Sequence, residues 1–166
     1  MAERKTNSSM QLTRAADYAV RVMVFLAGQP SNARHSLGEL ARGTGAPASF
    51  LSKVMQALSR SALITSQRGH SGGFAIAPQG LEASMREVIE AVDGPIQLNV
   101  CLGSPAACAR QGWCPAHPLW SRAQEAMLTV LDGARIADLA ECKRIPDAGP
   151  AAGLSRECQS HGCGCS

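Results

Sequence analysis

Three cysteines and a histidine lie close together in the middle of the sequence, where residues 101–117 read CLGSPAACARQGWCPAH. Cys101, Cys108, Cys114 and His117 are separated by six, five and two residues. Thiolates and imidazole nitrogens are soft or borderline ligands, so this set suits a tetrahedral zinc ion or an iron–sulfur cluster. A disulfide, or no bound group at all, remains open at this point. The choice depends on the elements that position the loop.

The other cysteines also fall in the second half of the chain, at positions 142, 158, 163 and 165. The opening MAERKTNSSM has no apolar segment behind its charges, so it is not a secretory signal. The most apolar run, residues 15–27, is too short to span a bilayer and carries Asp17 and Arg21. We therefore expect a cytoplasmic protein without a membrane partner, in which clustered cysteines bind metal or sense redox state.

The net charge of +3 conceals an asymmetry between the two halves of the chain. Residues 1–80 hold nine Lys and Arg against three acidic residues, whereas residues 81–166 hold seven against ten. A basic first half indicates contact with a polyanion, although ordinary surface variation is an equally good explanation of charge alone.

The basic half has the pattern of a helix-turn-helix. Thr13 is the expected N-cap of a buried first helix that ends at Gly28, and Ser36 with Glu39 forms a capping box for a short second helix ending near residues 43–45. After a Gly-containing turn, SFLSKVMQALSRSALI predicts a longer helix with an apolar stripe. Its outer face is polar and basic, made of Ser49, Ser52, Lys53, Gln56 and Arg60.

A β-hairpin is predicted directly after this helix. The loop Arg68-Gly69-His70-Ser71-Gly72-Gly73 separates two β-compatible runs and forms a basic, glycine-rich tip. A helix-turn-helix followed by a hairpin is a winged helix, so the expected fold is mainly α with a small β-hairpin wing.

The second half continues with a capping box at Ser84 and Glu87 and then, beyond the cysteine loop, with a long amphipathic helix at residues 117–133. We interpret this long helix as a dimerisation helix; packing against its own domain is the alternative. The expected organisation is a flexible N-terminus (1–9), a winged helix-turn-helix domain (10–94), a cluster-binding loop (95–117), the dimerisation helix with a short following helix (118–142) and a flexible cysteine-containing tail (143–166).

From about Met10 to Ala140 the chain resembles the iron–sulfur winged-helix transcription regulators, the family that includes IscR, NsrR and RirA. The resemblance rests on MQLTRAADYAVR, SFLSKVMQALSRSALI, RGHSGGFAIA, the three-cysteine loop and AMLTVLDGARIADL, which occur in this order. It implies a homodimer on a palindromic operator in double-stranded DNA, with the helix around residues 49–60 in the major groove and the wing in the minor groove.

The residues themselves agree with that mode of DNA binding. Lys53, Arg60 and Arg68 would neutralise phosphates, and Arg68 could also enter a narrow minor groove. Base edges are within reach of Ser49, Ser52 and Gln56, and Gln suits adenine. Gly69 and His70 complete the expected contacts at the wing tip.

The resemblance also implies that Cys101, Cys108 and Cys114 ligate an iron–sulfur cluster. For the fourth ligand it gives two candidates. His117 stands where IscR-like members place a histidine on a [2Fe–2S] cluster, and Asp17 where NsrR-like members place an aspartate that reaches the [4Fe–4S] cluster of the other subunit. Asp17 could instead be a solvated first-turn residue that favours the helix dipole, and His117 a neighbour of a helix N-cap.

We therefore expect a repressor that senses nitric oxide, redox state or iron supply, with an NsrR-like member slightly favoured by the segments MQLT, VLDG and ADL. A zinc-stabilised winged helix without a sensory cluster is the main alternative. An RNA-binding zinc module is weaker because aromatic content is 4%. No nucleophile–base pair stands at a recognisable spacing, so we expect no enzyme.

Overall fold

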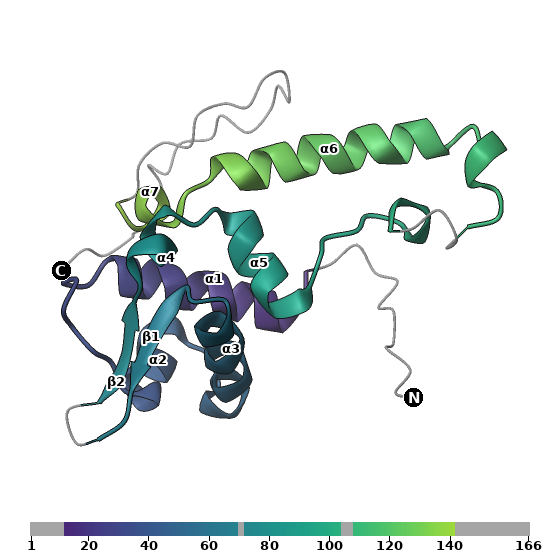
Figure 1. Cartoon of the computed structure of the whole chain (residues 1–166). Coiled ribbons are helices and arrows are strands. Elements are labelled where there is room, and N and C mark those ends of the chain that lie inside the picture. Colours follow the sequence, from purple (N-terminus) through teal and green to yellow (C-terminus); the bar gives the residue numbers. More distant parts are fainter. Residues whose placement is uncertain (1–11, 70–71, 104–107, 142–166) are drawn as a thin grey trace.

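The computed structural model describes residues 12–69, 72–103 and 108–141 (Figure 1). It is mainly helical with a small hairpin, as the sequence predicted. In chain order the elements are α1 (Arg14–Ala27), α2 (Leu37–Thr44), α3 (Ala48–Arg60), β1 (Ile64–Gln67), β2 (Gly73–Ile76), α4 (Pro78–Glu82), α5 (Met85–Asp93), η1 (Val100–Leu102), η3 (Gln111–Trp113), α6 (His117–Gly133) and α7 (Ile136–Ala140). The expected flexible ends and His70 lie outside the described residues.

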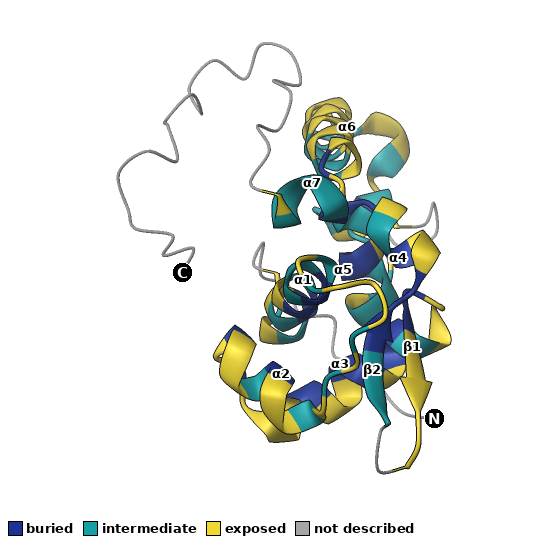
Figure 2. Cartoon of the chain, turned by 90° about the vertical axis from the view of Figure 1, so that its left-hand side faces the viewer, coloured by how far each residue is buried: buried dark blue, intermediate teal, exposed yellow. Residues whose placement is uncertain are grey.

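One hydrophobic core holds α1, α2, α3, α5 and α7 together (Figure 2). Its α1 residues, spaced as one helical face, are Ala19, Val22, Met23 and Leu26. The α3 stripe predicted from periodicity is buried as expected, and its members are Leu51, Val54, Met55 and Leu58. Burying one large aliphatic side chain contributes about 1.5–3 kcal/mol to the free energy of folding, so this core is the main source of stability.

Local side-chain hydrogen bonds begin three of the helices where the sequence predicted them. Thr13 Oγ1 accepts from the backbone N–H of Ala16 at the start of α1. Ser36 with Glu39, and Ser84 with Glu87, form complete capping boxes at α2 and α5. Because these bonds satisfy otherwise unpaired N–H groups, they fix where each helix starts.

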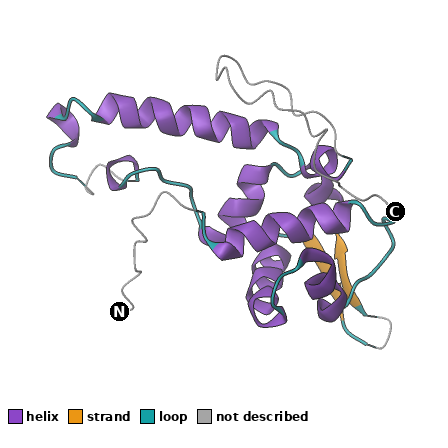
Figure 3. Cartoon of the chain, turned by 180° about the vertical axis from the view of Figure 1, so that it is seen from behind, coloured by secondary structure: helices purple, strands orange, loops and turns teal. Residues whose placement is uncertain are grey.

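The two strands pair antiparallel, with Ile64 opposite Ile76 and Gln67 opposite Gly73 (Figure 3). The buried ends of both strands pack on the helical core, and the other end projects beyond it. This is the wing of a winged helix.

The long helix α6 extends away from the rest of the molecule and returns to it through α7 (Figure 1). No residue of α6 is buried in the single chain. Its side chains are exposed or half-exposed while the helix contacts α5 and η1, so packing against its own domain, the alternative to dimerisation, is only partial in the described part of the chain. No helix among the described residues has the length and apolar character needed to cross a membrane.

Candidate nucleic-acid interface and cysteine loop

The polar face of α3 is on the molecular surface. Each of the five residues predicted for this face is exposed: Ser49, Ser52, Lys53, Gln56 and Arg60. The apolar stripe is anchored in the core, so the orientation of α3 is set by packing and the hydrophilic face has to point outwards. The face contains hydroxyl, amide and cationic groups and no carboxylate. Cationic groups suit the phosphates of a nucleic acid, and hydroxyl and amide groups suit the edges of its bases.

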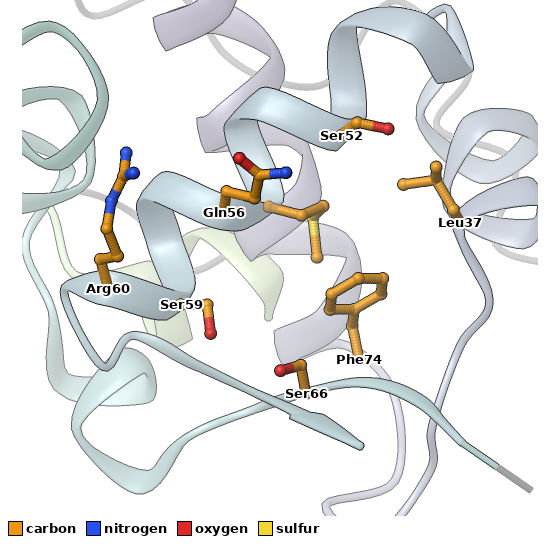
Figure 4. A pocket seen from close by; sticks show the side chains of 8 residues that line it. Leu37, Ser52, Gln56, Ser59, Arg60, Ser66 and Phe74 are labelled. Atoms are coloured by element: carbon orange, nitrogen blue, oxygen red, sulfur yellow. The ribbon is translucent and has the colours of Figure 1, made fainter. Parts of the chain in front are cut away.

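A shallow hollow of about 370 Å³ lies between α3 and the hairpin (Figure 4). Gln56 and Arg60 lie along the α3 side of this hollow, and Ser66 and Phe74 lie on the strand side. Its remaining lining residues are Leu37, Ser52, Met55 and Ser59. None of the lining residues is acidic, so an anionic backbone can approach the helix–wing junction without like-charge repulsion.

Arg68 and Gly69 stand at the described edge of the wing tip, and both are exposed. Gly69 has φ +116°, a backbone conformation that L side chains rarely adopt. The structure thus places these residues where the sequence predicted a projecting basic tip. Contact with DNA remains a prediction for all the residues assigned to it.

Sequence reasoning missed Arg34 as a residue that supports the wing. Its guanidinium Nη1 donates to the backbone carbonyl of Gly73 at 3.3 Å. The neighbouring His35 forms an antiparallel bridge with Phe74. Periodicity within one segment cannot reveal a pair 39 residues apart. Arg34 adds another exposed cation beside the hairpin.

The carboxylate of Glu39 lies in the first turn of α2 and takes part in the capping box there. It accepts hydrogen bonds from the backbone N–H and the hydroxyl of Ser36, both at 2.7 Å. These bonds, with the backbone bond as the larger cause, hold the pKa of Glu39 below its ordinary value of 4.5. The charge is therefore fixed in place at the helix N-terminus, where the helix dipole favours it.

The cysteine loop runs from the end of α5 to the start of α6. Cys101 lies in η1 and is buried, whereas Cys108 and Cys114 are half-buried. All three thiols are free. Two large apolar side chains of the loop, Val100 and Trp113, are exposed to 54% and 71%.

The two candidates for a fourth ligand have different partners. His117 is the first residue of α6, and its Nε2 lies 3.2 Å from the side-chain nitrogen of Gln111. Asp17 lies in the first turn of α1 and forms an ion pair with Arg21 at 2.8 Å. Thr13 donates a 2.7 Å hydrogen bond to Asp93 at the end of α5, so the cysteine loop leaves the domain beside the start of α1.

The single chain does not gather these residues into a finished site. Within the described ranges, no three of the His, Cys, Asp and Glu side chains are placed so that they could hold a metal ion. The donor set nevertheless fits an iron–sulfur cluster chemically, since three free thiols lie on one short loop. The same three thiols with His117 also fit zinc.

A family model described as Rrf2, iron-dependent transcriptional regulator, matches residues 12–142. This range includes the winged helix, the cysteine loop and α6. It leaves out the C-terminal segment that contains Cys158, Cys163 and Cys165.

Among curated proteins, one from Azotobacter vinelandii named as HTH-type transcriptional regulator ORF2 is 30% identical over 138 residues, covering 83% of this chain and 84% of its own. Another from Mycobacterium tuberculosis strain H37Rv, named as HTH-type transcriptional regulator Rv1287, is 30% identical over 131 residues. That alignment covers 79% of this chain and 81% of the relative.

Solved structures with the same fold include the oxidised form of CymR from Staphylococcus aureus, at 25% identity and a TM-score of 0.62 over 80% of this chain and 97% of that one. CymR, the global cysteine regulator of B. subtilis, gives 24% identity and a TM-score of 0.65, covering 82% and 100% of the two chains. IscR of T. potens is 19% identical in sequence, with a TM-score of 0.64, and the match covers 81% of this chain and 88% of that one. These likenesses agree on a winged-helix fold.

Proposed function

This chain belongs to the Rrf2 family of transcriptional regulators, and we propose that it is a homodimeric repressor whose operator affinity depends on an iron–sulfur cluster. Membership of the family makes it a DNA-binding regulator of transcription and not an enzyme, as the sequence predicted. One observation carries the finer proposal: the free thiols of Cys101, Cys108 and Cys114 lie on the segment that joins the winged helix to the protruding α6.

DNA binding is assigned to the exposed face of α3 and to the wing. Lys53 and Arg60 would neutralise phosphates while Gln56, on the same face, faces base edges in the major groove. Arg68 at the wing tip would enter the neighbouring minor groove, whose negative potential attracts guanidinium groups. A regulator that binds operator DNA in this way would act in the cytoplasm of a bacterium.

The proposed dimer forms through α6. None of its residues is buried in the single chain, and two of its apolar side chains, Leu119 and Val130, are 65% and 44% exposed. If a second copy of the chain packs the same helix against this one around a two-fold axis, the exposed apolar side chains of both copies become buried. Two symmetry-related winged helices then match the two half-sites of a palindrome.

The cluster is assigned to Cys101, Cys108 and Cys114, with the fourth position taken by His117 or by Asp17 of the partner subunit. An iron–sulfur cluster supplies an inorganic core that nitric oxide, oxidants or iron shortage can degrade. The cysteines would tie the loop into one arrangement while they are all engaged. Release of the thiols would let the loop relax and change the angle between the two DNA-binding domains. Because the two half-sites of the operator lie at a fixed spacing, the altered dimer would bind it less tightly.

A zinc-stabilised regulator is the second candidate, favoured by the Cys₃His donor set within one short loop. Zinc has no redox chemistry, so the same cysteines would then only stabilise the fold. Operator binding would not respond to nitric oxide or to iron supply. The two candidates differ in one directly measurable property, the identity of the bound metal.

The test is to purify the full chain without oxygen, record its absorption spectrum and quantify iron, sulfide and zinc per chain. The proposal expects visible absorbance with near-stoichiometric iron and sulfide, and loss of both in Cys101→Ser. Cys142→Ser, outside the proposed ligand set, is the matched control and should retain them. A colourless protein with one zinc per chain would establish the second candidate instead.

A further inference from the structure

We propose that Arg86 is a positioning residue that passes the state of the cysteine loop to the winged helix by fixing the angle of α6. This inference rests on the proposed function and adds the path by which the loop acts. The path joins α5, α6 and the segment that leads into the loop: Arg86 bonds to α6 directly and to that segment through Glu90.

Arg86 on α5 contacts two carboxylates at once. Its Nη1 donates to Asp132 Oδ2 at 3.0 Å, and its Nε donates to Glu90 Oε1 at 3.2 Å. Asp132 belongs to the last turn of α6, so this side chain joins the winged helix to the long helix. The planar, forked guanidinium sets the direction of both bonds, which a lysine ammonium would not do.

Glu90 extends this contact to the cysteine loop. The same Oε1 that accepts from Arg86 also accepts from the backbone N–H of Ile96 at 3.1 Å. Ile96 lies five residues before Cys101. A change in the loop that withdraws the Ile96 N–H therefore alters the partners of the oxygen that orients Arg86.

The next part of the loop is held by α6. The backbone N–H of Leu98 donates to Gln124 Oε1, in the middle of α6, at 2.9 Å. The chain leading to Cys101 is thus bound to α5 at Ile96 and to α6 at Leu98. Its position and the angle between the two helices are determined together.

The C-terminal end of α6 is firmly attached to the DNA-binding domain. Just beyond it, Arg135 forms a β-bridge with Ser84, and the N–H of Ile136 donates to the carbonyl of Ala83 at 3.0 Å. Ile136 is fully buried in the core. The Arg86–Asp132 bond lies beside this attachment and adds a directional restraint on the tilt of α6 relative to the DNA-binding domain.

The test compares operator affinity of cluster-loaded and cluster-free protein in the wild type and in Arg86→Gln. The probe is a duplex that the loaded wild-type protein selects from a random-sequence pool, and cluster-free protein is prepared by anaerobic chelation. We expect Arg86→Gln to reduce the loaded-to-free affinity ratio by at least about fivefold, the lower end of typical coupling between sites. Iron and sulfide content should stay at the wild-type level.

Three further variants separate coupling from general stability. Asp132→Asn should reduce the ratio in the same way even if Arg86→Gln folds poorly. Arg86→Lys keeps the charge and should restore only part of the ratio. Arg122→Gln, which removes an exposed cation elsewhere on α6, is the matched control and should leave the ratio unchanged.

Two outcomes would overturn the inference, and they are distinguishable. If the wild-type ratio is large and Arg86→Gln and Asp132→Asn lower both affinities equally, the residues only stabilise the fold. If the wild-type protein itself shows a ratio of one, the proposed function fails and this inference fails with it.

Discussion

His35 and Phe74 exchange two backbone hydrogen bonds, each 2.9 Å long, and so tie the segment before α2 to the second strand of the wing. The pair gives β2 a neighbour on the side that β1 does not occupy. The wing is therefore attached to the helix-turn-helix by backbone bonds as well as by its buried base, and its described strands are held at a defined place relative to α3.

Gly73 lies against the backbone of His35 and has no room there for a side chain. Its φ is +149°, and a Cβ built there would lie 2.8 Å from the carbonyl oxygen of His35. We predict that Gly73→Ala lowers the free energy of unfolding by about 1–3 kcal/mol and weakens operator binding. Chemical denaturation checks the first effect and fluorescence anisotropy the second. Gly28→Ala, where φ is −78° and contacts are ordinary, should change neither. Unaltered stability in Gly73→Ala would show that the bridge can shift freely.

Substitutions on the exposed face of α3 should separate phosphate contacts from base contacts. Arg60→Gln is expected to weaken binding to all DNA sequences and to reduce the slope of log affinity against log salt by about 1. Gln56→Ala is expected to cost about 1–3 kcal/mol only on the selected operator and to relax specificity at one base pair. Titrations at several salt concentrations measure both. Equal effects of Gln56→Ala on operator and random DNA would exclude base recognition by this residue.

The capping box at α2 predicts a pH dependence of stability. The folded-state pKa of Glu39 lies below its ordinary value of 4.5, so the native state binds fewer protons than the unfolded state. The contribution of Glu39 is thus fully present above pH 4.5 and is lost as the pH falls through the lowered pKa. Glu39→Gln retains a capping side chain that does not titrate. Unfolding free energies of wild type and variant should diverge above this window and converge below it; a constant difference would contradict the assignment.

If the proposed dimer forms through α6, a charge inserted among its exposed apolar side chains should dissociate it. Leu119→Glu should shift the protein towards monomer, because a carboxylate in a closed apolar interface is left unpaired. Ser121→Glu, also on the exposed surface of α6, is the control. Sedimentation velocity over a range of protein concentrations measures the change. Identical association of the two variants would move the dimer interface away from Leu119.

Much of the fold could be predicted because its signals are local. The N-caps at Thr13, Ser36 and Ser84 act within three residues, and the apolar stripe of α3 follows one helical period. Both kinds of signal are visible in a short window of sequence. The outward face of α3 followed directly from the buried one.

The rest could not be predicted because it depends on pairs that are distant in sequence. Arg34 with Gly73 and Arg86 with Asp132 are separated by 39 and 46 residues, and no periodicity links them. The short helix α4 was also not anticipated. For the cysteines, residue types indicated metal or cluster chemistry, but the described ligand candidates do not converge in the single chain. Under the proposed function their convergence depends on the bound group and on a second subunit.

The most direct test of the central claim is the operator affinity of one anaerobic preparation, measured before and after nitric oxide treatment or cluster removal under identical salt. The loaded protein is expected to bind about 5- to 150-fold more tightly than the cluster-free protein. Cys114→Ser should bind like the cluster-free form whether or not iron and sulfide are supplied. Equal affinity before and after cluster loss would contradict the claim that the three cysteines control DNA binding.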